Sequence, residues 1–125
     1  MAVMSKTLAL GLAMPMAAQA AQLVVSHFSG PTYALDYTDG ELTITDQNNE
    51  VGQRVPAWVT WDSATRTAYV SDESWFGPGT GRFASFHLSE DGSLTVSGVT
   101  TTDGGDLASG VYGGANGNSF IGQAA

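Results

Sequence analysis

Three side chains in this sequence could carry out acid–base chemistry on a small molecule. His27 could act as a general acid or base, because histidine exchanges protons near neutral pH, although a histidine beside a strand more often only hydrogen-bonds its own loop. Asp72 and Glu73 are adjacent carboxylates that could share such work or could cap the loop that follows them. Because neighbours in a strand point to opposite faces, the two can cooperate only where the strand has ended.

Two further residues are candidates for binding a substrate. Arg54 could hold a carboxylate through two parallel hydrogen bonds, although a salt bridge to a neighbouring acid explains it equally well. Trp75 lies in the loop "SWFGPG" and could form an apolar wall of a pocket. Trp58 and Trp61 are expected in the core between packed sheets.

The sequence gives no sign of a metal or cofactor. It has no cysteine, no G-x-S-x-G, no P-loop and no H-E-x-x-H. The loop "SDESWFGPGTG" has few oxygen ligands beyond those of residues 71–73, too few for a calcium site. The segment "GGANGNS" joins two predicted strands and opens no helix, so it is a poor phosphate cradle. We therefore expect no metal and no cofactor.

Residues 1–20 are typical of a secretory signal peptide. Lys6 supplies the positive start, residues 8–16 are apolar, and Ala18 and Ala20 are the small residues of a cleavage site. The apolar run is shorter than the roughly 20 residues of a membrane-spanning helix, and Pro15 interrupts it, which argues against the alternative of a membrane anchor. We expect cleavage after Ala20, a secreted product, and no membrane association afterwards.

The remaining residues, 21–125, are strongly acidic. Three arginines stand against twelve acidic residues, which gives a net charge of −9. Such a surface repels phosphate backbones, so nucleic acid is excluded as a partner. Without disulfides, an exported chain of this size depends on a hydrophobic core or on additional chain.

The hydrophobic pattern is that of an all-β protein. Short, often alternating runs rich in β-branched and aromatic residues are separated by Asp-Gly, Gly-Pro and glycine-rich turns. No stretch after Ala20 has helical spacing over three turns. The predicted strands are 22–28, 32–38, 41–45, 57–61, 67–71, 82–88, 93–99, 109–113 and 119–124.

These strands recur in order along the chain. "QLVVSHFS" aligns with "TAYVSDES" at an offset of 45, and Asp39-Gly40 falls on Asp91-Gly92 at an offset of 52. Val59 falls on Val111 at the same offset of 52. A four-stranded unit that repeats at this period is typical of a β-propeller blade. A single sandwich of about nine strands is the alternative, but it does not explain the matched order.

On these residues the chain resembles the lactonase family of seven-bladed β-propellers, which includes bacterial 6-phosphogluconolactonases and fungal carboxy-cis,cis-muconate cyclases. The resemblance rests on "PAWVTWD", on "AYVSDE" six residues later, on "FHLSEDGSLTVSG" and on "VYGGANGNSFIGQA". It implies about two four-stranded antiparallel blades in residues 21–125, both incomplete, as the N-terminal part of a seven-bladed ring. The C-terminal blades would be missing, so we expect an unstable and inactive fragment.

The resemblance also implies a function and a ligand face. The chain would come from a secreted lactone hydrolase or muconate-lactonizing isomerase whose partner is a small carboxylated lactone or muconate-like acid. Ligands would meet the loops around His27, residues 54–58, residues 72–81 and residues 103–109. The catalytic His, Arg and Glu of the cyclase branch fall in later blades, and no motif here matches them. The alternative is a non-enzymatic extracellular propeller that binds a ligand or a protein.

Overall fold

Nine strands make up the described part of the chain. The structure, a computed structural model, describes residues 20–49, 56–73, 81–103, 108–113 and 119–124. The strands are β1 Ala20–Ser26, β2 Thr32–Thr38, β3 Glu41–Asn48, β4 Pro56–Asp62, β5 Thr67–Asp72, β6 Gly81–Leu88, β7 Leu94–Thr102, β8 Ala108–Gly113 and β9 Ser119–Ala124. All nine predicted strands are therefore confirmed.

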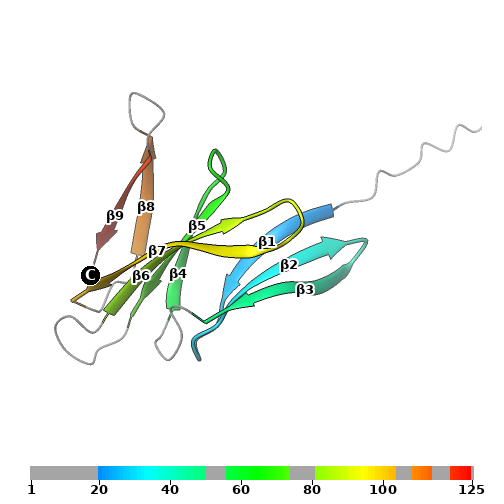
Figure 1. Ribbon diagram of the computed structural model, residues 1–125, viewed down its shortest axis with the longest axis horizontal. Coiled ribbons are helices and arrows are strands. Elements are labelled where there is room, and N and C mark those ends of the chain that lie inside the picture. The colour runs from blue at the N-terminus through cyan, green and yellow to red at the C-terminus, as the bar shows by residue number, and fades with distance from the viewer. Residues whose placement is uncertain (1–19, 50–55, 74–80, 104–107, 114–118, 125) are drawn as a thin grey trace, which may run out of the picture.

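The strands form three antiparallel sheets that follow one another along the chain (Figure 1). Sheet A has the order β1-β2-β3, sheet B has the order β4-β5-β6-β7, and sheet C pairs β8 with β9. The sequence predicted two incomplete four-stranded sheets. Sheets A and B confirm about two blades, and the expectation that both are incomplete was wrong only for sheet B, which has all four strands. The strands after it begin a separate sheet.

The repeat extends to details of strand pairing that the sequence did not reveal. In sheet A the register shifts between Ala34 and Leu35, and in sheet B it shifts between Ser85 and Phe86. These two β-bulges lie 51 residues apart, at equivalent places in their blades. Because a bulge re-aims a strand and is retained as a structural feature, matched bulges confirm that the sheets are repeats of one unit.

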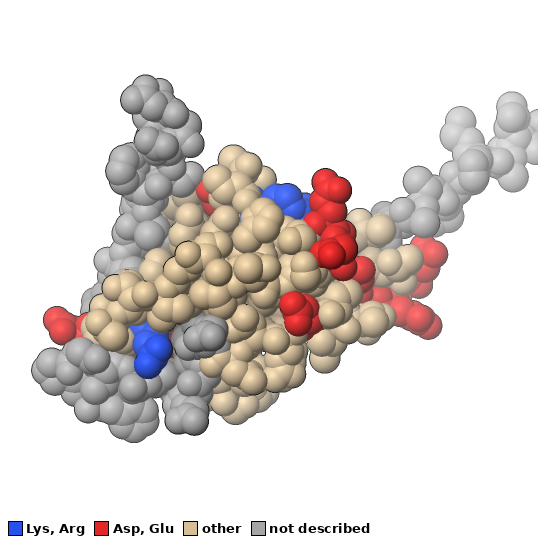
Figure 2. Space-filling view, in the orientation of Figure 1, with Lys and Arg blue, Asp and Glu red and all other residues tan. Residues whose placement is uncertain are grey.

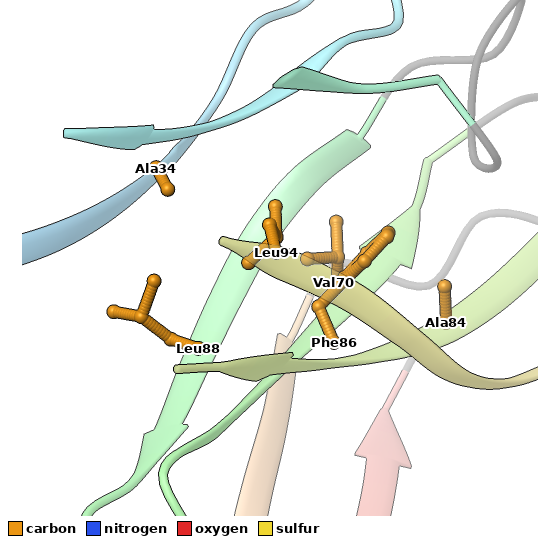
Figure 3. Close-up of a cluster of buried hydrophobic side chains, with 6 residues drawn as sticks. All are labelled: Ala34, Val70, Ala84, Phe86, Leu88 and Leu94. Carbon is orange, nitrogen blue, oxygen red and sulfur yellow. The ribbon is translucent and has the colours of Figure 1, made fainter. Parts of the chain in front are cut away.

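Packing between sheets A and B builds the hydrophobic core. Alternate residues of the strands point to one face, and the buried cluster collects those that face the neighbouring sheet: Ala34, Val70, Ala84, Phe86, Leu88 and Leu94 (Figure 3). Phe86 is the largest side chain in this cluster and is fully buried. Val24, Val59 and Val96 pack against its edge.

The turns at the outer ends of the two blades occupy equivalent places but differ in conformation. Asp39 and Gly40 have φ values of 52° and 94°, which allow a two-residue turn between β2 and β3. The turn between β6 and β7 spans five residues, 89–93, and only Gly92 has a positive φ, of 83°. The turn between β6 and β7 is therefore three residues longer than the turn between β2 and β3.

A hydrogen-bonded carboxylate organises the longer turn. The Oδ1 atom of Asp91 accepts hydrogen bonds from the Ser93 hydroxyl at 2.7 Å and the Ser93 backbone N–H at 3.1 Å. Both bonds stabilise the ionised carboxylate, so the pKa of Asp91 is lowered below its ordinary value, chiefly by the Ser93 side chain.

Replacing Ser93 by alanine is expected to raise the pKa of Asp91 towards its ordinary value, because the largest stabilising bond is lost. In the native protein the lowered pKa contributes stability above the unfolded pKa, and this contribution disappears as the pH falls through the folded value. A carbon-detected NMR titration of the Asp91 carboxyl in the native protein and the S93A variant checks this. An unchanged midpoint in S93A would contradict the account.

Polar side chains fasten sheet A to this turn of sheet B. Asp46 Oδ2 accepts the Leu94 backbone N–H at 2.7 Å, and Thr45 donates to the Gly92 carbonyl at 2.9 Å. Arg66 donates through Nε to the Leu88 carbonyl at 2.9 Å, and its Nη2 also donates to the Gln22 side chain. The contacts hold the two blades in a fixed register.

One face of sheet A carries large apolar side chains that the described residues do not cover. Leu42 and Ile44 are 60% and 59% exposed, and Leu23 and Val25 are 40% and 46% exposed. By the matched register, this face is the counterpart of the face of sheet B that packs on sheet A. It is therefore suited to pack against another sheet.

Replacing both Leu42 and Ile44 by lysine is expected to leave the folded state intact and to raise the monomeric fraction. Exposed substitutions change the free energy of unfolding by only about 0.5 kcal/mol each, and charges on an apolar face oppose association. Light scattering and thermal unfolding of the full chain measure both effects. The matched control is Leu94→Lys, at the buried counterpart of Leu42, which should prevent folding; a double variant that also fails to fold would contradict the account.

Candidate functional site

One end of the sheets gathers the elements that the sequence assigned to ligand binding. Register places the end of β1 beside the start of β2, the start of β4 beside the end of β5, and the start of β6 beside the end of β7. Figure 1 shows these ends together with the start of β8 along the lower side of the molecule. We call this the β1–β2 turn end; its turn comprises residues 27–31.

His27 is held in a defined orientation in this turn. Its backbone N–H donates to the Pro31 carbonyl at 2.8 Å, and the Gly30 N–H donates to the His27 carbonyl at 2.9 Å. The Nδ1 atom accepts the Ser29 backbone N–H at 3.2 Å and lies 2.7 Å from the Ser29 hydroxyl. Because a backbone N–H can only donate, the neutral imidazole carries its proton on Nε2. The exposed ring therefore offers a hydrogen-bond donor to a ligand oxygen.

The carboxylate pair lies at the end of β5. Asp72 is the last residue of the strand and is fully buried, whereas Glu73 follows the strand and is half-buried. Neighbours within a strand point to opposite faces, but the strand has ended before Glu73, so this rule does not keep the two carboxylates apart. Pro56, the first residue of β4, lies opposite Asp72 in the register.

The two predicted substrate-binding residues, Arg54 and Trp75, lie outside the described residues. Within the described ranges, the cation at this end is Arg82, which is half-buried near the start of β6. The sequence did not indicate Arg82 as a binding residue, because such residues were expected in loops, whereas Arg82 lies inside a strand. Its position directly after the loop that carries Trp75 could have indicated it.

Trp58 and Trp61 are not core residues in the described structure. They are 46% and 43% exposed, and the prediction that both pack in the core was wrong. Their spacing of three along β4 places them on opposite faces: Trp58 lies opposite Ser71, and Trp61 lies opposite Ala68. Trp61 lines an apolar cleft of about 240 Å³ between β1 and β4.

Acidic side chains dominate the opposite end of the blades. Figure 2 shows them gathered on the side where the β2–β3 turn lies. Two shallow clefts of about 250 and 300 Å³ there share Asp36 as a lining residue. Among the residues that the structure describes, no group of three His, Cys, Asp or Glu side chains could hold a metal ion. An acidic surface of this kind repels a carboxylated ligand.

The repeated antiparallel sheets are typical of the blades of a β-propeller. The family model described as "Lactonase, 7-bladed beta-propeller" matches residues 22–124. The chain belongs to this lactonase family, which confirms the family and the fold class predicted from the sequence. No curated protein and no solved structure matches the chain. The described residues contain no helix that is long and apolar enough to cross a membrane.

Proposed function

We propose that this chain contributes to a secreted lactonase-type propeller that opens the ring of a small carboxylated lactone at the β1–β2 turn end. The family match over residues 22–124 is the observation that carries the proposal. The position of His27 directly after β1, and of Asp72 and Glu73 at the end of β5, supports it, because general acid–base chemistry requires titratable groups.

The ring opening needs one group that accepts a proton from water and one group that donates a hydrogen bond to the carbonyl oxygen of the lactone. The half-buried carboxylate of Glu73, which follows the buried Asp72, takes a proton from water, whose oxygen forms a bond to the lactone carbonyl carbon. The ester C–O bond breaks, and the leaving oxygen regains a proton, which gives the hydroxy acid. His27 donates through Nε2 to the carbonyl oxygen, where negative charge develops. Arg54 and Arg82 are the cations suited to a substrate carboxylate.

The test is hydrolysis of muconolactone, a small lactone that carries a free carboxylate, by the full chain. A pH indicator reports the acid that is released. Exchange of Asp72 for asparagine or Glu73 for glutamine is expected to lower kcat by about 100-fold or more. Glu90→Gln, an exposed acid at the opposite end, serves as the control and should retain full activity. Equal rates in all active variants would reject the proposal, whereas no turnover above the uncatalysed rate would agree with the expectation that this piece of the ring is inactive by itself.

The cyclase chemistry of the family is a second outcome of the same assay. One carboxylate of cis,cis-muconate adds to a carbon of the double bond while the adjacent carbon takes up a proton, which forms a lactone without water. The rate is followed by the loss of ultraviolet absorbance. A chain that converts muconate but does not hydrolyse the carboxylated lactone is an isomerase. Saturable binding of both compounds without turnover would favour the non-enzymatic alternative.

Secretion belongs to the same proposal. The charged start, apolar run and small residues of positions 1–20 support export and cleavage after Ala20. Sequencing the amino terminus of material collected outside the producing cells tests this. A product that begins at Ala21 is expected, and a secreted product that retains Met1 would contradict cleavage.

A further inference from the structure

Trp58 is exposed although it lies on the face of β4 that is turned towards a neighbouring sheet. It lies on the face of β4 that is turned towards sheet C, because it shares that face with Thr60, which hydrogen-bonds to Ser109 of β8. Its ring is nevertheless 46% exposed. The residue is also close to the β1–β2 turn end, since it is the third residue of β4 and Ser109 is the second of β8.

The polar group of the indole is already occupied. Trp58 Nε1 donates to the Thr60 hydroxyl at 3.1 Å. Thr60 in turn donates to the Ser109 carbonyl at 2.8 Å, and the two hydroxyl oxygens lie 2.7 Å apart. The ring is therefore fixed in orientation and presents its apolar face to a ligand.

Counting protons shows what the network can still bind. A threonine hydroxyl has one proton and two lone pairs. Because the Thr60 proton goes to the Ser109 carbonyl, the proton between the two hydroxyls belongs to Ser109. The proton and both lone pairs of the Thr60 hydroxyl are then used, so it cannot bind a ligand. The Ser109 hydroxyl has donated its proton and can only accept a further hydrogen bond. A ligand group at this point must donate a hydrogen bond.

A buried hydroxyl without a partner lies next to this network. Ser71 faces Trp58 directly across the β4–β5 register and is fully buried. Its Oγ has no hydrogen-bond partner in the described structure. Unsatisfied buried polar groups are rare and gather at functional positions, because each costs about 1–3 kcal/mol.

We propose that Trp58 and Ser109 form a subsite for a saturated, hydroxylated ring. The ring's C–H groups pack on the indole face, whose negative quadrupole attracts them, and one ring hydroxyl donates to Ser109 Oγ. A carboxylate has no proton to donate and meets only lone pairs at Ser109. The subsite thus selects the uncharged, hydroxylated part of a substrate. Its place in catalysis rests on the proposed function, whereas the binding itself does not.

The test measures binding of 1,5-anhydroglucitol, an uncharged ring that cannot be hydrolysed, to the full chain. Indole N–H signals are followed by NMR, and cyclohexanecarboxylate serves as the charged comparison. The signal of Trp58 should move and that of Trp61 should not. Trp58→Ala is expected to weaken binding about tenfold or more and Ser109→Ala about threefold, whereas Trp58→Phe retains most of the affinity.

Trp61→Ala is the matched control, because Trp61 has nearly the same exposure on the opposite face of β4. A loss of affinity in this control equal to that in W58A would overturn the subsite, as would equal binding of the carboxylate or no binding of the uncharged ring. Unchanged lactone turnover in W58A with unchanged ring affinity would overturn the subsite and leave the lactonase proposal standing. Ring binding at Trp58 without any lactone turnover would support the subsite and would agree with the expected inactivity of this chain by itself.

Discussion

Replacing Phe86 by alanine is expected to lower the free energy of unfolding by about 3–5 kcal/mol. Phe86 is fully buried where sheets A and B meet. Its neighbours Ala68 and Val96 are held in place by the pairing of β5 and β7 with β6. They cannot close over the missing ring. The substitution therefore removes both the transfer free energy of the ring and the contacts around the cavity it leaves.

Urea unfolding of the native protein and the variant measures this loss. Phe28→Ala is the matched control, because Phe28 is 68% exposed in the β1–β2 turn and its removal should cost less than about 0.5 kcal/mol. Phe86→Leu should cost an intermediate amount. Equal effects of F86A and F28A would show that sheets A and B do not pack as described.

Replacing Gly92 by alanine is expected to cost about 2–4 kcal/mol, because two separate penalties add. The φ of 83° lies in the left-handed region, which side chains rarely adopt. An added Cβ would also lie 2.8 Å from the Thr45 hydroxyl oxygen and 2.9 Å from its Cβ. Thr45 cannot easily give way, since it donates a hydrogen bond to the Gly92 carbonyl.

Gly40→Ala separates these two penalties. Gly40 has a similar φ of 94°, but an added Cβ would meet nothing within 4 Å. Only the backbone penalty of about 1–2 kcal/mol remains, so G40A should be clearly more stable than G92A in thermal unfolding. If both variants lose the same stability, the close approach of β3 to the longer turn is wrong.

Most of the fold could be predicted because its determinants are local. Alternating apolar residues define each strand, and Asp39-Gly40 and Asp91-Gly92 mark the turns that join them. The recurrence of these patterns then indicates blades, and the matched bulges show that the repeat holds in three dimensions.

The contacts between blades could not be predicted from the sequence. The bond from Arg66 to Gln22 spans 44 positions, and that from Leu94 to Asp46 spans 48. Nothing in the local pattern distinguishes these polar residues from solvated ones. Trp58 was misplaced for a related reason: strand periodicity gives the face of a residue, but the exposed fraction depends on how far the neighbouring sheet extends over it.

The central claim, that ligands meet the β1–β2 turn end of a lactonase-family propeller, is tested most directly by NMR. Backbone amide signals of the full chain are followed while muconolactone, a lactone with a free carboxylate, is added. Shifts should concentrate at His27, Asp72 and Ser109, with small changes at the opposite end. Shifts concentrated instead around Gly40, Arg66 and Gly92 would contradict the account.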